Sequence, residues 1–249
     1  MSPPLPRANP FAVDAWFDMS CTLVYALPLA DIAARVPFPL QVDTFAGRWG
    51  LLAVAAVQTR RLRPAGLPAC LGSDFILAGY RHFVRFRRRD GRLLRGLHII
   101  RSQTDSRRMC LMGNLLTRYH YQHAPLRLER DGEIVSLHDG GRGLRVTVDL
   151  STPADGAVPL PPESPFADWS EARRYCGPMP YTFSVDAPGR RVIVVEGQRS
   201  NWRPRPVEVL QAQVPLLQQW GLGHARLANA FVVESVPYHW QRGRAEPWS

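Results

Sequence analysis

Tight turns between segments of alternating apolar and polar residues constrain the fold of this chain most strongly. Residues 80–86 (YRHFVRF) alternate in this way, the pair Asp90-Gly91 follows, and residues 93–100 form a second apolar segment. Because Asp-Gly suits the turns of β-hairpins, this pattern predicts two paired antiparallel strands. Hairpin spacing favours a mainly β (α+β) fold, an antiparallel barrel or sandwich, over alternating strands and helices. Similar turn signals lie at residues 131–132, 139–141 and 186–189.

The rest of the chain predicts further strands and a few short flanking helices. No change in composition divides the sequence, so we expect a single domain over residues 1–249, with a proline-rich N-terminal segment at 1–12. The other expected elements are a strand at 14–26, a helix at 29–36, two strands around a turn at 45–47, a long loop at 151–167, a helix at 168–176 that begins near Asp168, and a strand or broken helix at 207–221 around Pro215.

The chain contains no lysine, because all 31 Lys+Arg positions are arginine. A guanidinium stays protonated and forms no Schiff base, so chemistry that requires a lysine amine is excluded. The formal net charge of +10 fits either a polyanion partner or a basic surface without a specific partner. Because the arginines are scattered and no nucleic-acid-binding motif is present, we favour the basic surface and do not expect a nucleic-acid partner.

Sequence features also indicate compartment and cofactor use. No apolar stretch reaches the length of a membrane span and the N-terminus lacks an apolar signal region, so we expect a cytoplasmic protein. The four cysteines are far apart and are expected to be reduced. The pair His120 and His123 has no evident third ligand, so no metal site is predicted. No phosphate- or dinucleotide-binding glycine motif is present, and no cofactor is expected.

Five segments of the chain together resemble one protein family. They are VDTFAGRWGLLAVAAVQTRRLRPAGLP (42–68), YRHFVRF (80–86), LRGLHIIRSQTDSRRMCLMGNLLTRYHY (94–121), EGQRSNWRPRPVEV (196–209) and NAFVVESVPYHW (229–240). Over about residues 14–243 the chain resembles the DUF2071 family, which is similar in fold to acetoacetate decarboxylase. The resemblance implies a cone-like antiparallel β-barrel with a central small-molecule pocket.

The same resemblance argues against the decarboxylase's own chemistry. Acetoacetate decarboxylase uses a lysine Schiff base assisted by a glutamate. Its strand motif placed on residues 75–81 puts Leu77 at the position of the acid, and residues 113–121 put Tyr121 near the lysine position. The resemblance therefore implies the fold and the pocket without the Schiff base.

Candidate functional residues come from four segments. If residues 114–123 form a strand, Thr117, Tyr119, Tyr121 and His123 share one face, which is suited to acid–base work or is simply a barrel wall with satisfied hydroxyls. Residues 101–106 fit carbonyl or carboxylate binding, or a helix start capped by Thr104 or Asp105. The candidate acid–base residues are Tyr119, Tyr121, His120 and Asp105, and the candidate substrate-binding residues are Arg63, Arg101, Asn114, Thr117, Trp202 and Arg203.

Two of these segments have equally plausible structural roles. Arg63, at the start of a stiff loop between Pro64 and Pro68, fits a carboxylate clamp or a structural ion pair. Residues 199–206 fit a pocket rim with a stacking Trp202, or a bulged edge strand.

Two functional classes remain open at this point. The first is a cofactor-independent enzyme that acts on a small carbonyl or carboxylate compound by acid–base catalysis. The second is a non-catalytic binding protein for a small organic anion. In both, the partner is a small anionic molecule and the membrane is not involved; a homo-oligomer is compatible with either.

The missing lysine gives a first testable prediction. After incubation with acetoacetate and borohydride, the intact mass of the protein should be unchanged, because no side-chain amine can form a reducible Schiff base. An adduct that maps to residues inside the predicted pocket would contradict this prediction.

Overall fold

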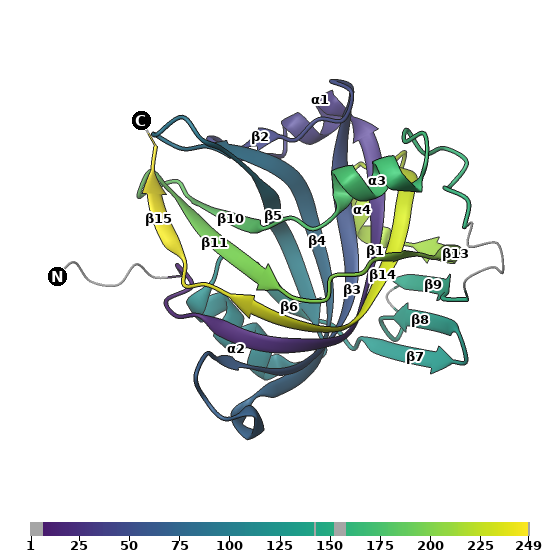
Figure 1. The fold of residues 1–249 in the computed structure, drawn as a ribbon, viewed down its shortest axis with the longest axis horizontal. Coiled ribbons are helices and arrows are strands. Elements are labelled where there is room, and N and C mark those ends of the chain that lie inside the picture. Colours follow the sequence, from purple (N-terminus) through teal and green to yellow (C-terminus); the bar gives the residue numbers. More distant parts are fainter. Residues whose placement is uncertain (1–6, 142, 152–157, 249) are drawn as a thin grey trace.

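The computed structural model describes residues 7–141, 143–151 and 158–248, and its largest part is one sheet that pairs back onto itself (Figure 1). Strands β14, β1, β3, β4, β5, β10 and β11 pair in this order, and β11 pairs with β14 again. We call this the ring sheet. Its strands within the described ranges, with the shorter ones beside them, are β1 (Val13–Pro28), β2 (Gln41–Val42), β3 (Trp49–Pro64), β4 (Ser73–Arg87), β5 (Leu93–Thr104), β6 (Tyr121–His123), β10 (Tyr181–Asp186), β11 (Arg191–Arg199), β12 (Arg205–Pro206), β14 (Arg226–Trp240) and β15 (Arg244–Pro247).

The predicted mainly β fold is confirmed, and the prediction of a purely antiparallel sheet is wrong. β5 pairs in parallel with both β6 and β10. A parallel pair needs a long connection between its strands. Here a helix joins β5 to β6, and a second sheet and another helix lie between β5 and β10, so the chain re-enters the ring in the same direction as β5.

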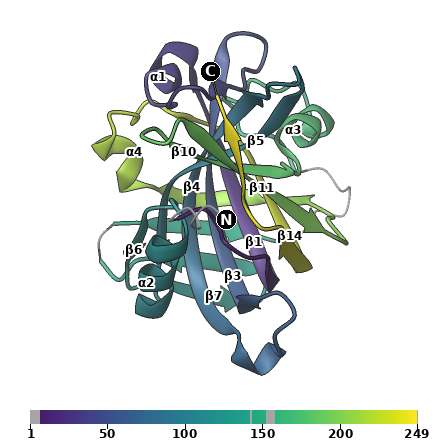
Figure 2. The same ribbon diagram turned by 90° about the vertical axis from the view of Figure 1, so that its left-hand side faces the viewer.

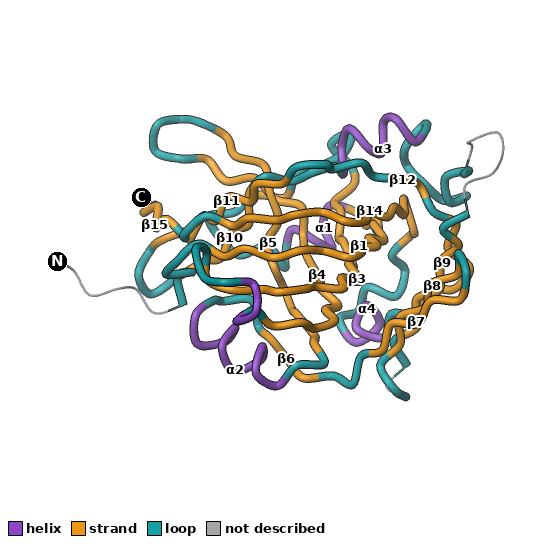
Figure 3. The backbone as a smooth tube through the Cα atoms, turned by 60° about the horizontal axis from the view of Figure 1, so that its bottom comes forward, coloured by secondary structure: helices purple, strands orange, loops and turns teal. Residues whose placement is uncertain are grey.

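A second, four-stranded sheet lies against the outside of the ring sheet (Figures 1 and 3). The predicted turns at 131–132 and 139–141 join its strands, as expected from their Asp-Gly sequences. Outward side chains of β1 and β3 pack with its apolar face in one buried cluster, so the central ring strands are apolar on both faces. The strands of the second sheet are β7 (Arg127–Asp131), β8 (Ile134–His138), β9 (Arg145–Asp149) and β13 (Glu208–Gln213).

The helices are short, as predicted, but several boundaries differ. The helix expected at 29–36 ends at Ala33, and the segment 207–221 is a strand followed by a helix in which Pro215 takes the first position, where its missing N–H is not needed. The strand expected at 114–123 is wrong, because α2 continues to Leu116. The helices are α1 (Leu29–Ala33), α2 (Arg107–Leu116), α3 (Trp169–Cys176), α4 (Pro215–Gln219) and the 3₁₀ turn η1 (Ala69–Leu71).

Helix caps and turns explain where these elements begin. Asp168 caps α3 as expected, since its carboxylate accepts a hydrogen bond from the Glu171 N–H at 2.7 Å. α2 is capped by Ser106 and not by Thr104 or Asp105. At the turn 45–47, β2 pairs with β4 rather than with β3.

Two predicted loops are described only in part. Residues 152–157 of the loop 151–167 and residues 1–6 of the proline-rich segment lie outside the described residues. In the part of the chain that is described, no helix has the length and apolarity to cross a membrane.

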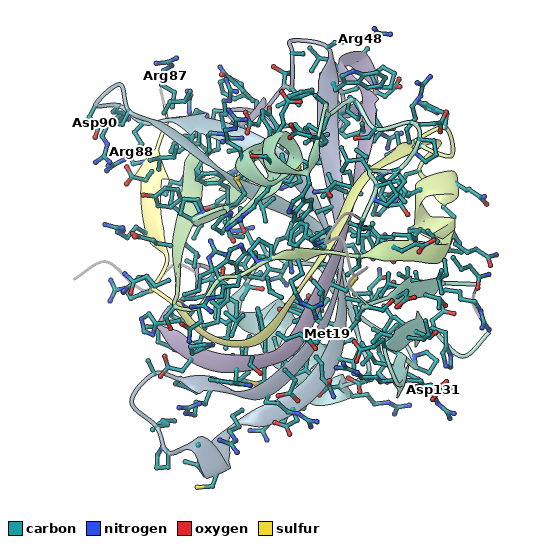
Figure 4. All side chains as sticks on the ribbon, turned by 45° about the vertical axis from the view of Figure 1, so that its right-hand side comes forward. Met19, Arg48, Arg87, Arg88, Asp90 and Asp131 are labelled. Atoms are coloured by element: carbon teal, nitrogen blue, oxygen red, sulfur yellow. The ribbon has the colours of Figure 1, made fainter. Side chains whose placement is uncertain are left out.

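The tip of the β4–β5 hairpin carries the densest run of arginines. Figure 4 shows Arg87, Arg88 and Asp90 at the periphery of the molecule, at the end of this hairpin. Arg88 pairs with Asp90 at 3.3 Å and with Glu246 of β15 at 2.8 Å. This part of the positive charge is therefore solvated and partly neutralised, as expected for a hairpin tip.

A buried carboxylate joins β4 and β5 at the loop after β2. Asp43 is fully buried and accepts from the guanidinium groups of Arg85 and Arg95, the latter at 2.6 Å. Removal of one partner from such a group leaves buried charge uncompensated, which is far more costly than loss of an exposed pair.

Asp43→Asn should lower the free energy of unfolding by about 2–4 kcal/mol, because two partly buried guanidinium groups lose their counter-ion. Urea unfolding of the two proteins measures this loss. Asp18→Asn is the control, since its pair with Arg60 is 36–41% exposed and should contribute below about 1 kcal/mol. Equal losses in both variants would contradict the prediction.

Two imidazoles face each other on neighbouring positions of β4 and β5. His82 and His98 are register partners with ring centroids 6.4 Å apart. Both ring nitrogens of His82 and Nδ1 of His98 are buried without a hydrogen-bond partner in the described structure. Burial, reinforced by the neighbouring imidazole and Arg35, lowers the pKa of His82 to about 3, and burial lowers that of His98 to about 4.

This pair predicts acid sensitivity in a defined pH range. The unfolded chain binds protons at these histidines below about pH 6.5, whereas the folded protein binds them only near their lowered pKa values. Stability is therefore complete above pH 6.5 and falls as the pH drops towards 4, by about 1.4 kcal/mol per pH unit for each group. His82→Phe should reduce this slope in urea titrations between pH 6.5 and 4.5, and the exposed control His224→Phe should not.

Candidate functional site

The ring sheet encloses a cavity of about 570 Å³, a volume typical of sites for drug-sized ligands. Inward-facing side chains of β1, β3, β4, β5 and β14 form its wall. The helix α2 and the loop between β3 and β4 contribute to one end, and both lie at the lower end of the ring in two orthogonal views (Figures 1 and 2). The cavity is the candidate site.

A row of small side chains makes room at the centre of this cavity. Strand register aligns Thr22, Ala55, Gly79 and Ser102 across β1, β3, β4 and β5. A Cβ atom at Gly79 would lie 3.1 Å from a terminal nitrogen of Arg81. The missing side chain of Gly79 therefore gives the guanidinium of Arg81 its space on the inner face of β4.

Arg81 is the most unusual residue of the cavity wall. Its Nε is buried, and no hydrogen bond or ion pair is formed by its guanidinium within the described residues. Burial lowers its pKa, an effect that three nearby phenols partly oppose. An arginine remains charged even so, and a buried charge without a partner is costly. The site therefore holds a positive charge that is available to an anion.

Three tyrosines surround this guanidinium. The rings of Tyr119 and Tyr121 lie 6.4 Å apart, and the Tyr119 hydroxyl accepts from Asn9 Nδ2 at 3.2 Å. Burial raises the pKa of both phenols well above the usual value near 10. They are neutral at physiological pH and act as hydrogen-bond donors. Tyr238, the third, accepts from Arg199 at 2.7 Å.

The remaining charged groups of the wall are also arginines. Arg63 donates to the carbonyl oxygens of Leu67 at 2.8 Å and Arg61 at 2.9 Å, and Arg199 donates to Tyr238 and to the carbonyl of Met179. Arg108 of α2 lies at the exposed end. Among the described lining residues there is no aspartate, glutamate or histidine, so the electrostatic potential of the cavity favours anions.

Half of the residues predicted from the sequence lie in this cavity. Thr117 and Trp202 are part of its wall, and Arg63 lies between it and a shallow surface pocket. Leu77 and Tyr121, which the resemblance sets at the acid and lysine positions, both line it. The predicted residues that line the cavity are Arg63, Thr117, Tyr119, Tyr121 and Trp202.

Four predicted residues lie outside the cavity because of local backbone geometry. His120 has a φ of +51° between the two tyrosines and is exposed. The carboxylate of Asp105 accepts from the Ile76 N–H at 2.8 Å, next to the capped start of α2. Arg101 alternates with inward Ser102, so its guanidinium faces away and lies 5.5 Å from the Trp220 ring centroid. Arg203 is exposed in the segment before β12.

Asn114 positions a cavity residue instead of lining the cavity. Its side-chain amide donates to the Tyr121 carbonyl at 2.8 Å and accepts from the Tyr121 N–H at 2.9 Å. A Cβ atom at Gly113 would lie 2.4 Å from the Tyr121 ring. These contacts hold Tyr121 against α2, which explains the Gly-Asn pair in the sequence.

Sequence reasoning missed Arg81, Arg199 and Tyr238 as cavity residues. Arg81 belongs to the alternating segment 80–86 and was expected on a polar hairpin face. Gly79, two residues earlier on the same face, is the signal that could have found it, because a glycine inside a strand often marks space for another group.

Comparison with known proteins identifies the family and the fold. Residues 15–239 match DUF2071, described as an uncharacterized conserved protein, so the chain belongs to this family. No curated protein sequence matches the chain. The fold is that of acetoacetate decarboxylase-like proteins, which the following structures represent.

Three solved structures resemble the chain over nearly its whole length, at identities that show the fold alone. Acetoacetate decarboxylase from Legionella pneumophila has a TM-score of 0.60 and 11% identity, with 98% of this chain and 92% of that one covered. An acetoacetate decarboxylase-like enzyme from Sphingomonas wittichii RW1 has a TM-score of 0.59 and 13% identity, with 96% and 93% covered. The enduracididine biosynthesis enzyme MppR complexed with pyruvate has a TM-score of 0.57 and 13% identity, with 98% and 91% covered.

The unpaired charge predicts that Arg81→Met is more stable than the parent protein. Removal of a partnerless buried guanidinium should raise the free energy of unfolding by about 1–3 kcal/mol. For a chain of this size each kcal/mol corresponds to about 2–4 °C in Tm. Thermal unfolding in ligand-free buffer measures the change. A lower Tm for Arg81→Met, with no change in the exposed control Arg89→Met, would contradict this prediction.

Proposed function

We propose that this protein binds a small organic anion in the ring cavity, with Arg81 as the principal binding group. The observation that carries the proposal is an enclosed guanidinium without a carboxylate partner, in a cavity whose charged lining residues are all arginines. A bound carboxylate would accept charge-assisted hydrogen bonds from Arg81 and lower the free-energy cost of its burial.

The neighbouring phenols support a carboxylate or carbonyl ligand. Tyr119 and Tyr121 are neutral donors on the same wall, and Ser102 and Thr22 add hydroxyls in the row beside them. These groups can orient an anion whose head lies on Arg81. Pyruvate in MppR shows that a protein of this fold holds a small carboxylate, and this supports the same ligand class here.

A cofactor-independent enzyme is the second candidate, and the two phenols favour it. A neutral tyrosine beside a guanidinium can donate a proton or hydrogen bond to a substrate carbonyl. His120 and Asp105 lie outside the cavity, so among the described residues the wall offers acids and cations but no imidazole or carboxylate as base. Any reaction here is therefore one that needs carbonyl polarisation rather than proton abstraction by such a base.

Ligand-induced stabilisation tests the proposal. Monocarboxylates such as pyruvate, benzoate and octanoate should include at least one that raises the Tm of the parent protein in a concentration-dependent way, since a ligand that binds only the folded state stabilises it. Arg81→Met should lose this shift, and the exposed control Arg89→Met should keep it. Absence of any shift, or an equal shift in Arg81→Met, would overturn the proposal.

A further inference from the structure

The shape and polarity of the cavity restrict the class of anion further, and this inference rests on the proposed function. The head of the ligand belongs beside Arg81. The inner face of β4 runs from Arg81 past Gly79 to Leu77 and Phe75, all towards the loop between β3 and β4. Six residues of strand span about 20 Å. The cavity is thus elongated from a buried charge towards one end.

The wall along this direction is apolar. Leu77 and Phe75 of β4 face Val57 and Leu62 of β3 in the lining, and the methionine Met109 of α2 joins them. A small keto acid such as pyruvate has no apolar part to cover these side chains. A ligand that fills the cavity therefore needs an apolar body several carbon atoms longer than pyruvate.

The open end is apolar as well. Four side chains line the cavity and are at the same time exposed to solvent: Phe11 is 39%, Leu67 44%, Leu71 58% and Met112 41% exposed. Single exposed apolar residues need no explanation, but a group at the mouth of a cavity indicates a binding surface. Methionine is flexible enough to adapt to different apolar groups.

The number of free guanidinium groups limits the number of anionic heads. Arg63 and Arg199 already donate to protein oxygen atoms at 2.7–2.9 Å, whereas Arg81 has no partner in the described residues. One carboxylate satisfies Arg81. A second carboxylate at the far end would meet Leu67 and Leu71, where its desolvation is costly.

We propose that the ligand is an amphipathic monocarboxylate, an acid with one carboxylate on Arg81 and an aliphatic or aromatic body of at least about six carbon atoms that extends towards the mouth. Calorimetric titration of straight-chain acids from acetate to decanoate tests this. The Kd should fall about fourfold for each added methylene group, as expected for its transfer from water to an apolar wall, until the cavity is filled.

Two kinds of variant separate the head from the body of the ligand. Arg81→Met should abolish the preference for octanoate over the neutral octan-1-ol. Leu71→Gln and Met112→Gln should reduce the gain per methylene group, and both positions are exposed enough for the protein to fold normally. Leu111→Gln is the matched control, because Leu111 lies beside Met112 on α2, is 70% exposed and does not line the cavity.

The outcomes distinguish this inference from the proposed function. If acetate or pyruvate binds as tightly as octanoate and binding requires Arg81, the amphipathic class is wrong and the anion site stands. If octanedioate binds more tightly than octanoate, the single-head inference is wrong. If no acid binds, or if Arg81→Met binds acids like the parent protein, the proposed function itself is overturned.

Discussion

The pairing of β11 with β14 is the constraint on which the candidate site depends, because it converts an open sheet into a ring with an interior. Only Gly197, Gln198 and Arg199 pair with Trp240, His239 and Tyr238 at this junction. The guanidinium of Arg199 strengthens the short ladder, since it donates to the Tyr238 hydroxyl and lies 4.9 Å from the Trp202 ring centroid. A Cβ atom at Gly197 would lie 2.6 Å from that hydroxyl, so the junction requires glycine at this position.

Closure of the ring places charge where water is limited, and this sets the chemistry that remains possible. In most folds a buried arginine pairs with a carboxylate, as Arg85 and Arg95 do with Asp43. Inside the ring, Arg81 has only phenols and Arg199 around it. The same absence of carboxylates that leaves Arg81 unpaired also removes the usual general bases from the described wall, so anion binding and the lack of base chemistry have one physical origin.

The sequence predicts elements with local causes well and fails where the cause is a register or a long-range contact. Asp-Gly turns and the Asp168 cap depend on neighbouring residues, and both are found. The inner face of a strand depends on bulges: opposite β4, Tyr80 pairs with Arg101 and Arg81 with Ile99, so one residue of β5 is extra and both Ile99 and Ser102 line the cavity. Because one such residue reverses the facing of all that follow, alternation alone misplaced Arg101 outside its true position.

The candidate site illustrates the same limit and also why the tyrosines were found. Thr117, Tyr119 and Tyr121 were placed on one face from strand alternation, although only Tyr121 belongs to a strand, β6. Their common orientation comes instead from α2, whose Asn114 holds the Tyr121 backbone, and from the left-handed turn at His120 that directs the imidazole outward between them. A left-handed residue of this kind costs conformational energy, and the Asn114 contacts on both sides of the Tyr121 peptide stabilise it. The geometry of the phenols around Arg81 is thus fixed by a helix end, which no strand periodicity encodes.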